Sequence, residues 1–171
     1  MRQFLNSESN VLITGMTGLI GGELFRRLNA REQRGRLWAL IRPSADRDIV
    51  DRMTDRLARS GDYSTPGLHV TPVAGDILEP AWGLSPTVAK DISSSVDVII
   101  HNAADTSFAA RRDTAKTNIG GVQRLIEFAR GCKRDPLIVY MSTASNVGQV
   151  SGCDLSEDDG CRPAESLAGR T

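Results

Sequence analysis

The chain has 171 residues, 40% hydrophobic and 25% charged, and its 21 basic and 21 acidic side chains cancel. This length suffices for one domain with a sizeable core, and the balanced charge argues against binding to nucleic acid or an anionic membrane. No apolar run approaches the ~20 residues of a membrane span, and we expect the polar N-terminus not to be a secretory signal. Three cysteines without C-x-x-C spacing favour a cytoplasmic protein without disulfides.

The first predicted element is a strand over residues 10–13 that runs directly into Thr-Gly-x-x-Gly-x-x-Gly at residues 14–21. A helix is expected over about 18–30. This order is typical of a phosphate-binding unit, because the free N–H groups of the first helical turn face an anion. The first glycine allows a tight turn, the second lets the backbone approach a pyrophosphate, and the third lets the helix pack closely. A structural turn without a ligand is the alternative.

The second predicted strand, residues 36–41, is followed by Arg42. In a dinucleotide-binding fold this strand end contacts the adenosine ribose, where an acid favours NAD and a guanidinium suits the 2′-phosphate of NADP. No acid occurs before Asp46, so we expect NADP(H) rather than NAD(H). A helix predicted over 45–60 carries Arg52, which we expect to reach the same phosphate. Surface arginines on a solvated helix face are the alternative.

The third predicted strand, residues 68–74, leads into Gly-Asp-Ile-Leu at 75–78. A carboxylate just past a strand end, beside a dinucleotide crevice, can accept a hydrogen bond from the adenine amino group. Asp76 is placed for that role, and an ordinary loop cap is its alternative. Residues 79–91 are predicted to be irregular and then weakly helical.

The fourth predicted strand, residues 96–100, is followed by His101 and the small residues 102–104, which would allow a cofactor to approach closely. We interpret His101 as a strand-end histidine with a local hydrogen bond rather than as a catalytic base or a metal ligand. His69 is its only companion, and the cluster of ligands that a metal site needs is missing. No metal site is therefore predicted.

A long helix is predicted over 114–130, with Val122, Leu125, Ile126 and Ala129 facing inward. Asn118 and two glycines near its start are unfavourable in a helix interior, at about 1 kcal/mol for each glycine, which indicates a functional or close-packing reason. The fifth predicted strand, residues 137–141, delivers Ser142 and Thr143. Residues 146–171 show no periodicity and are predicted to be irregular.

Alternating strands and helices at this rhythm predict an α/β fold, a single doubly wound parallel sheet of Rossmann type with strand order 3-2-1-4-5. Right-handed crossovers then place all the strand ends along one edge. The motifs identified above all fall at these ends: Thr14, Arg42, Asp76, His101 and Met141.

Five motifs in this order resemble the extended branch of the short-chain dehydrogenase/reductase superfamily. They are Thr14-Gly-x-x-Gly-x-x-Gly21, Gly75-Asp-Ile-Leu78, His101-Asn-Ala-Ala104, Thr117-Asn-Ile-Gly120 and Tyr140-Met-Ser-Thr-Ala144. Within that branch the chain is most similar to the thioester reductase and fatty acyl-CoA reductase group, which has a male-sterility-type NAD-binding domain. The pointers are Leu40-Ile-Arg42, Gly75-Asp-Ile-Leu-Glu-Pro80 followed by Gly83-Leu-Ser85, and Ser142-Thr-Ala144.

The resemblance implies a set of cofactor-binding residues: Thr14, Gly15, Thr17, Gly18, Leu19, Ile20, Gly21, Arg42, Arg52, Asp76, Ile77, Asn102, Ala103 and Ala104. Members in the glycine turn would hold the pyrophosphate. Those at 42 and 52 would hold the 2′-phosphate, those at 76 and 77 would flank adenine, and the two alanines would line the inner ribose.

The resemblance also implies two catalytic residues, Asn118 in the active-site hydrogen-bond network and Thr143 on the substrate carbonyl. The family places a Tyr-x-x-x-Lys acid–base pair a few tens of residues later. This sequence has only Tyr63 and Tyr140, neither followed by lysine four positions on, and no lysine after Lys133. We expect the cofactor-binding portion of a longer enzyme, or an incomplete gene product, that lacks the final strands and the substrate lobe and is inactive by itself.

The function expected from the resemblance is NADPH-dependent reduction of an acyl thioester, bound to CoA or to a carrier protein, to an aldehyde or alcohol. A nucleotide-sugar epimerase or dehydratase, or a hydroxysteroid-type dehydrogenase, is the alternative within the same superfamily. A non-catalytic nucleotide-binding module is the alternative outside it. The helix over 114–130 often pairs in dimers of this superfamily, so a homodimer is a further possibility.

Overall fold

The computed structural model describes residues 6–29, 34–59, 70–106 and 111–142. The chain divides into two compact units, Met1–Tyr140 and Met141–Thr171, and the helices and strands described below all lie in the first. The second unit contains Thr143 and the predicted irregular segment 146–171, which lie outside the described residues.

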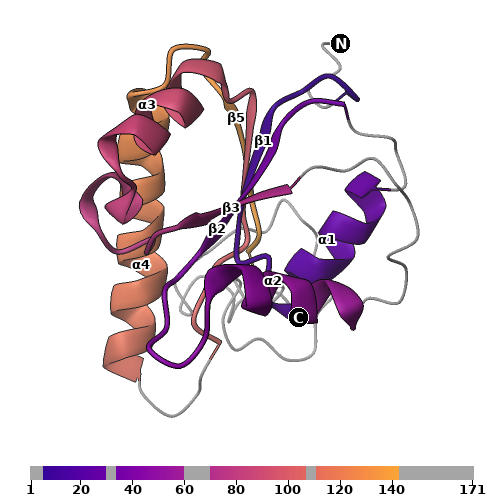
Figure 1. Cartoon of the computed structure of the whole chain (residues 1–171). Helices are drawn as coiled ribbons and strands as arrows, with labels where there is room; N and C mark the ends of the chain where they lie inside the picture. Colours follow the sequence, from indigo (N-terminus) through magenta and orange to yellow (C-terminus); the bar gives the residue numbers. More distant parts are fainter. Residues whose placement is uncertain (1–5, 30–33, 60–69, 107–110, 143–171) are drawn as a thin grey trace, which may run out of the picture. The chain divides into compact units, whose positions relative to one another are not determined.

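Strands and helices alternate along the first unit (Figure 1). The strands are β1 (Val11–Thr14), β2 (Leu37–Ile41), β3 (Val70–Ala74), β4 (Val98–His101) and β5 (Leu137–Tyr140). The helices are α1 (Leu19–Asn29), α2 (Ile49–Ala58), the 3₁₀ turn η1 (Pro80–Gly83), α3 (Pro86–Ser95) and α4 (Arg111–Arg130).

The five strands form one parallel sheet in the order β3-β2-β1-β4-β5, which confirms the predicted topology. The central strand β1 pairs on both sides, with Val11 opposite Leu37 of β2 and Val98 of β4. Strands β1, β2 and β4 are buried throughout, as expected of parallel strands covered on both faces. Since every strand runs the same way, their carboxyl ends share one edge.

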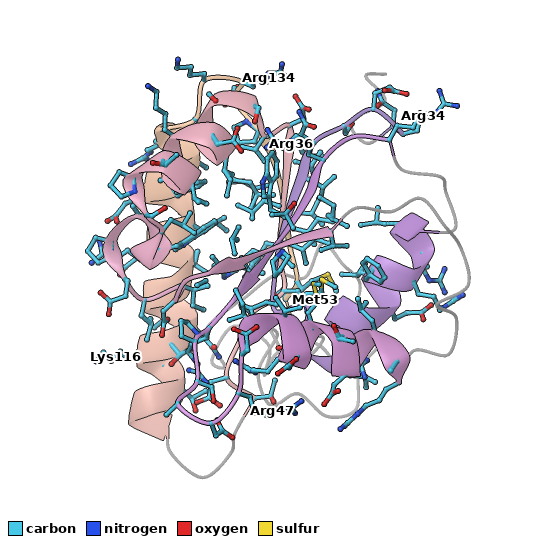
Figure 2. All side chains as sticks on the ribbon, in the orientation of Figure 1. Arg34, Arg36, Arg47, Met53, Lys116 and Arg134 are labelled. Atoms are coloured by element: carbon cyan, nitrogen blue, oxygen red, sulfur yellow. The ribbon has the colours of Figure 1, made fainter. Side chains whose placement is uncertain are left out.

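Two apolar cores lie on the two faces of the sheet, because successive strand side chains point to opposite sides. Leu12 of β1 belongs to the core under η1, α3 and α4, and Ile13 belongs to the core under α1 and α2. Figure 1 shows these two helical layers on either side of the strands. Figure 2 shows Met53 of α2 directed at the second core, against which it packs.

Two local predictions need correction. The segment predicted to be irregular and then weakly helical contains η1 and a regular α3, which begins where the Ser85 hydroxyl accepts from the Val88 N–H at 3.4 Å. On α4, Ile126 was predicted to face inward but is 41% exposed. Phe128 is buried instead at 9% exposure, because it lies three residues after Leu125 on the same face of the helix, whereas Ile126 directly follows Leu125 and is turned away from that face.

None of the helices in the described part of the chain is both long and apolar enough to cross a membrane. Within the same residues no group of three or more His, Cys, Asp or Glu side chains is placed to hold a metal ion.

Candidate functional site

A cavity of about 760 Å³ opens at the carboxyl edge of the sheet. Most of the predicted cofactor-binding residues line it: Gly15, Thr17, Gly18, Leu19, Ile20, Arg42, Arg52, Asp76, Ile77, Asn102, Ala103 and Ala104. Seven lining residues were not predicted: Leu40, Ile41, Gly75, Leu78, Asp105, Thr106 and Thr117. All but Thr117 lie at or just beyond the ends of β2, β3 and β4. Their place next to the predicted strand ends is therefore the sequence feature from which they could have been predicted.

The glycine turn forms one wall of the cavity. Gly15 has a φ of 72°, and a Cβ there would lie 2.6 Å from the Ala103 nitrogen, so both its backbone conformation and its surroundings require glycine. A Cβ on Gly21 would lie 2.2 Å from the Gly15 carbonyl oxygen. Gly21 therefore permits α1 to pack on the turn itself. A Cβ on Gly18 would meet the Gly15 carbonyl oxygen at 3.3 Å, a tight contact but a much less severe one than at Gly21, and Gly18 lines the cavity.

The N-terminus of α1 points its positive end at the cavity. Its first turn contains no acidic residue, so the partial positive charge of the free N–H groups is not offset there. Leu19 and Ile20 are 80% and 50% exposed at this end. Arg56 of α2 donates through Nη2 to the Leu19 carbonyl at 2.9 Å and so ties α2 to the first turn of α1.

Thr14 is buried beneath the turn and does not line the cavity. Its hydroxyl oxygen accepts from the backbone N–H groups of Asn102 and Ala103 at 3.2 and 3.1 Å. The Asn102 amide donates in turn to the Gly15 carbonyl at 3.2 Å. These bonds fix the loop after β4 against the glycine turn, so Thr14 shapes the cavity from behind.

His101 is a buried strand-end histidine with a local hydrogen bond, as predicted. It is 2% exposed, and its Nδ1 lies 3.0 Å from the Thr14 hydroxyl oxygen. Burial lowers the pKa of His101 from 6.5 to about 4, so the ring is neutral near pH 7. The ring belongs to the scaffold under the cavity and does not line it.

Arg42 and Arg52 both line the cavity at the end of β2. Arg52 donates through Nη1 to the Arg42 carbonyl, so part of its guanidinium is used to hold the chain. Among the described residues, the Arg42 guanidinium makes no hydrogen bond or ion pair. The nearest acid along the chain, Asp46, does not line the cavity, and a hydrogen bond from the Ser44 hydroxyl holds the pKa of Asp46 below its usual range.

Asp76 lies at the end of β3 in a tight turn. Its Oδ1 accepts from the Leu78 N–H at 2.9 Å, which is the loop-cap role considered for it. Its Oδ2 has no hydrogen-bond partner among the described residues and remains available at the cavity wall. Ile77 contacts α4, where an added Cβ on Gly121 would lie 2.9 Å from Ile77 Cδ1. Close packing thus explains this glycine within a helix.

Asn118 of α4 does not line the cavity but holds one of its walls. Its Oδ1 accepts from the Asp105 N–H at 2.8 Å, and its Nδ2 donates to the Asp105 carbonyl at 3.0 Å. The side chain thereby binds both backbone groups of the residue that follows Ala104. This arrangement accounts for an asparagine inside a helix.

Comparison with known proteins places similar chains among reductases. A family model described as Male sterility protein matches residues 13–160. The chloroplastic fatty acyl-CoA reductase 2 of Arabidopsis thaliana is 30% identical over 155 residues, covering 82% of this chain and 25% of that protein.

Two solved structures of reductase domains are also similar. The terminal R domain of the myxalamid PKS-NRPS biosynthetic pathway has a TM-score of 0.63 and 27% identity, covering 80% of this chain and 35% of that one. The reductase domain of a nonribosomal peptide synthetase from Mycobacterium tuberculosis has a TM-score of 0.58 and 29% identity, covering 81% and 34%. The chain thus spans about a third or less of the length of these relatives.

Proposed function

The chain belongs to the male sterility protein family of NAD-binding domains, and we propose that it is the NADP(H)-binding part of an oxidoreductase that reduces acyl thioesters. The fold and the family support a nicotinamide dinucleotide as the ligand.

The observation that carries the proposal is the convergence of four strand ends on one cavity. The glycine turn after β1, Arg42 after β2, Asp76 after β3 and the two alanines after β4 all line it. A dinucleotide needs an anion site, a ribose site, an adenine site and an unobstructed surface for the inner ribose, in that arrangement along the sheet edge. Gly18 lines the cavity and has no side chain, so a pyrophosphate can approach the backbone there, and the residues present fit the group.

We assign the binding roles as follows. The N–H groups at the start of α1, around Gly18, hold the pyrophosphate. The free oxygen of Asp76 accepts from the adenine amino group, beside Ile77. Asn102 and the alanines, fixed by Thr14, lie along the inner ribose. The dinucleotide, when bound, supplies the hydride for reduction, and this chain orients it.

Arg42 supports NADP(H) over NAD(H). Its guanidinium lines the cavity and is not engaged by any described partner, whereas Arg52 is bonded to the chain. A guanidinium matches the two-oxygen edge of a phosphate. We therefore assign Arg42 as the 2′-phosphate ligand and Arg52 as its support.

The substrate class rests on the relatives. Their names describe a fatty acyl-CoA reductase and the reductase domain of a nonribosomal peptide synthetase, and from these names we infer acyl groups on CoA or on a carrier protein as the substrate class. We propose the same class of thioester for the protein to which this cofactor-binding domain belongs. Asn118 then supports the reaction through the Asp105 segment, and Thr143, outside the described residues, binds the substrate carbonyl.

Nucleotide binding is the direct test, because the family's Tyr-x-x-x-Lys pattern does not occur in this sequence. The purified chain is titrated with NADPH and with NADH by calorimetry, alongside thermal unfolding. We expect both to bind, NADPH more tightly, with a melting temperature that rises with nucleotide concentration.

The control uses two glycine variants. Gly18→Asp places a side chain and a negative charge at the pyrophosphate position, and we expect it to abolish binding in a folded protein. Gly131→Ala, at the end of α4, meets only ordinary contacts and should bind like the parent. A folded parent that binds neither nucleotide would refute the proposal.

A further inference from the structure

The turn η1 contains three successive residues in the left-handed region. Ala81, Trp82 and Gly83 have φ angles of 48°, 57° and 63°. Glycine adopts this conformation readily, but alanine and tryptophan do so at a cost, so surrounding contacts must hold them in place. A bulky tryptophan in such a turn calls for a physical reason.

The tryptophan side chain anchors the turn. Its indole is fully buried and stacks on Phe128 of α4, with ring centroids 4.4 Å apart and an interplanar angle of 15°. It belongs to the core formed by η1, α3, α4 and one face of the sheet. Its Nε1 has no hydrogen-bond partner among the described residues. The indole is therefore held by packing.

The backbone N–H and C=O groups of Trp82, in contrast, both form hydrogen bonds, and one of these bonds is with Asp76. Its carbonyl oxygen accepts from the Asp76 N–H at 2.9 Å. Its N–H donates to the Glu79 carbonyl at 2.9 Å, and the Glu79 N–H donates to the Asp76 carbonyl at 3.0 Å. These three bonds close a ring between residues 76, 79 and 82. Asp76 and Trp82 thus lie at the two ends of one hydrogen-bonded turn, and the backbone of Trp82 helps to hold Asp76 in place.

Gly75 lies where this turn packs against β2, and the space around it is small. A Cβ at this position would lie 2.4 Å from the Trp82 carbonyl oxygen and 2.7 Å from Leu40 Cδ1. Leu40 also lines the cavity. The residue before Asp76 therefore packs closely between the Trp82 backbone and the side chain of Leu40 on β2, and only glycine fits there.

We propose that Trp82 is a positioning residue for adenine recognition, acting through its backbone bond to Asp76 while its indole clamps the turn on α4. The inference rests on the proposed function, in which Asp76 accepts from the adenine amino group. Trp82 does not line the cavity, so its effect on the nucleotide is transmitted through the turn.

The test compares NADPH with its hypoxanthine analogue, in which a carbonyl oxygen replaces the adenine amino group. The analogue keeps the phosphates, both riboses and the nicotinamide but offers no amino donor to a carboxylate. The parent chain should bind NADPH about tenfold more tightly than the analogue, the usual scale for a hydrogen bond to a charged group. Trp82→Leu should reduce this ratio to near one by weakening NADPH alone.

Trp82→Phe keeps a stacking ring on Phe128, removes an N–H without a described partner, and should restore most of the ratio. If Trp82→Leu does not fold, Phe128→Leu serves in its place, because it removes the stacking partner and leaves the turn sequence intact. Ile92→Ala is the matched control. It truncates a fully buried residue of the same core on α3 and should lower stability without changing the ratio.

The outcomes separate the two claims. A parent that binds neither nucleotide refutes the proposed function. A parent that binds both nucleotides equally refutes the adenine contact of Asp76 and with it the role of Trp82. The third outcome is that the parent prefers NADPH over the analogue and that folded Trp82→Leu or Phe128→Leu shows the same preference. That outcome refutes the positioning role of Trp82 alone.

Discussion

The Thr14 hydroxyl oxygen lies 3.0 Å from Nδ1 of His101, across the pair of strands β1 and β4. The same oxygen already accepts from the N–H groups of Asn102 and Ala103. With both lone pairs occupied, the hydroxyl directs its proton at Nδ1. His101 then accepts at Nδ1 and carries its own proton on Nε2. One buried hydroxyl thus links the glycine-turn strand, the histidine and the loop that borders the cavity.

This relationship predicts a pH dependence of stability. Burial lowers the pKa of His101 from 6.5 to about 4, so the unfolded chain takes up a proton at a higher pH than the folded one. Above pH 6.5 both states are neutral at this site and its contribution is complete. As the pH falls from 6.5 toward 4, stability should decrease by about 1.4 kcal/mol per pH unit, or about 3 kcal/mol in all. Urea unfolding between pH 5 and pH 7.5 measures the slope.

His101→Asn supplies the control for this slope. Asparagine can still accept from the Thr14 hydroxyl, but it does not titrate in this range. We expect the variant to lose the extra slope between pH 5 and pH 6.5, while His69, present in both proteins, contributes equally to each. Parallel curves for the two proteins would contradict the assignment of His101 as a buried neutral histidine.

A second prediction concerns the cofactor preference. Arg42→Ala removes the guanidinium assigned to the 2′-phosphate and should weaken NADPH binding by about ten- to a hundredfold. NADH has no such phosphate, so its affinity should stay within about twofold of the parent. Calorimetric titration of both nucleotides gives the two ratios.

Arg47→Ala is the matched control for Arg42. Arg47 is paired with Asp55 and does not line the cavity, so its removal should leave both affinities unchanged. Equal losses of NADPH and NADH affinity in Arg42→Ala would show that the residue shapes the site without binding the phosphate.

The sequence predicted the sheet order and most of the cavity wall because both follow from local signals. A glycine turn after an apolar strand, and polar or small residues at strand ends, are sufficient to place Gly18, Arg42, Asp76 and Ala103 on one edge. The parallel topology then brings them together without further information. His101 was also interpreted correctly, as a residue with a local hydrogen bond.

Other features depend on contacts that no local pattern contains. Nothing in the types of Ala81 and Trp82 favours left-handed backbone, which here is held by stacking on a helix about 45 residues later. The role of Arg52 as a donor to the Arg42 carbonyl needs the fold of the intervening loop. Whether Ile126 or Phe128 lies on the inner face of α4 depends on how the helix is rotated about its axis. The hydrophobic periodicity of the sequence determines that rotation only to within about one residue.

A third prediction concerns Asn118. Asn118→Ala removes both hydrogen bonds to the Asp105 backbone and should lower the free energy of unfolding by about 1–2 kcal/mol. The freed segment borders the cavity, so NADPH affinity should fall severalfold. Hydrogen exchange at the Asp105 amide should accelerate, since that N–H loses its acceptor. Gln123→Ala, at an exposed position on the same helix, should change none of these quantities.

The last prediction separates two glycines of the same turn. In Gly18→Ala the added methyl would lie 3.3 Å from the Gly15 carbonyl oxygen, an adjustable contact, so the fold should be retained. Gly18 nonetheless lines the cavity, so the methyl should interfere with the nucleotide, and NADPH and NADH affinity should fall together because both share the pyrophosphate. In Gly21→Ala the methyl would lie 2.2 Å from that oxygen and 2.6 Å from Met16 Cα.

This overlap with backbone atoms is too large for a small shift to relieve, so Gly21→Ala should lower stability by about 1–3 kcal/mol as well as impair binding. Thermal unfolding and nucleotide titration of both variants distinguish the two effects. A Gly18→Ala protein as unstable as Gly21→Ala would mean that Gly18 is a packing residue. Retained affinity in a folded Gly18→Ala protein would remove the glycine turn from the pyrophosphate site.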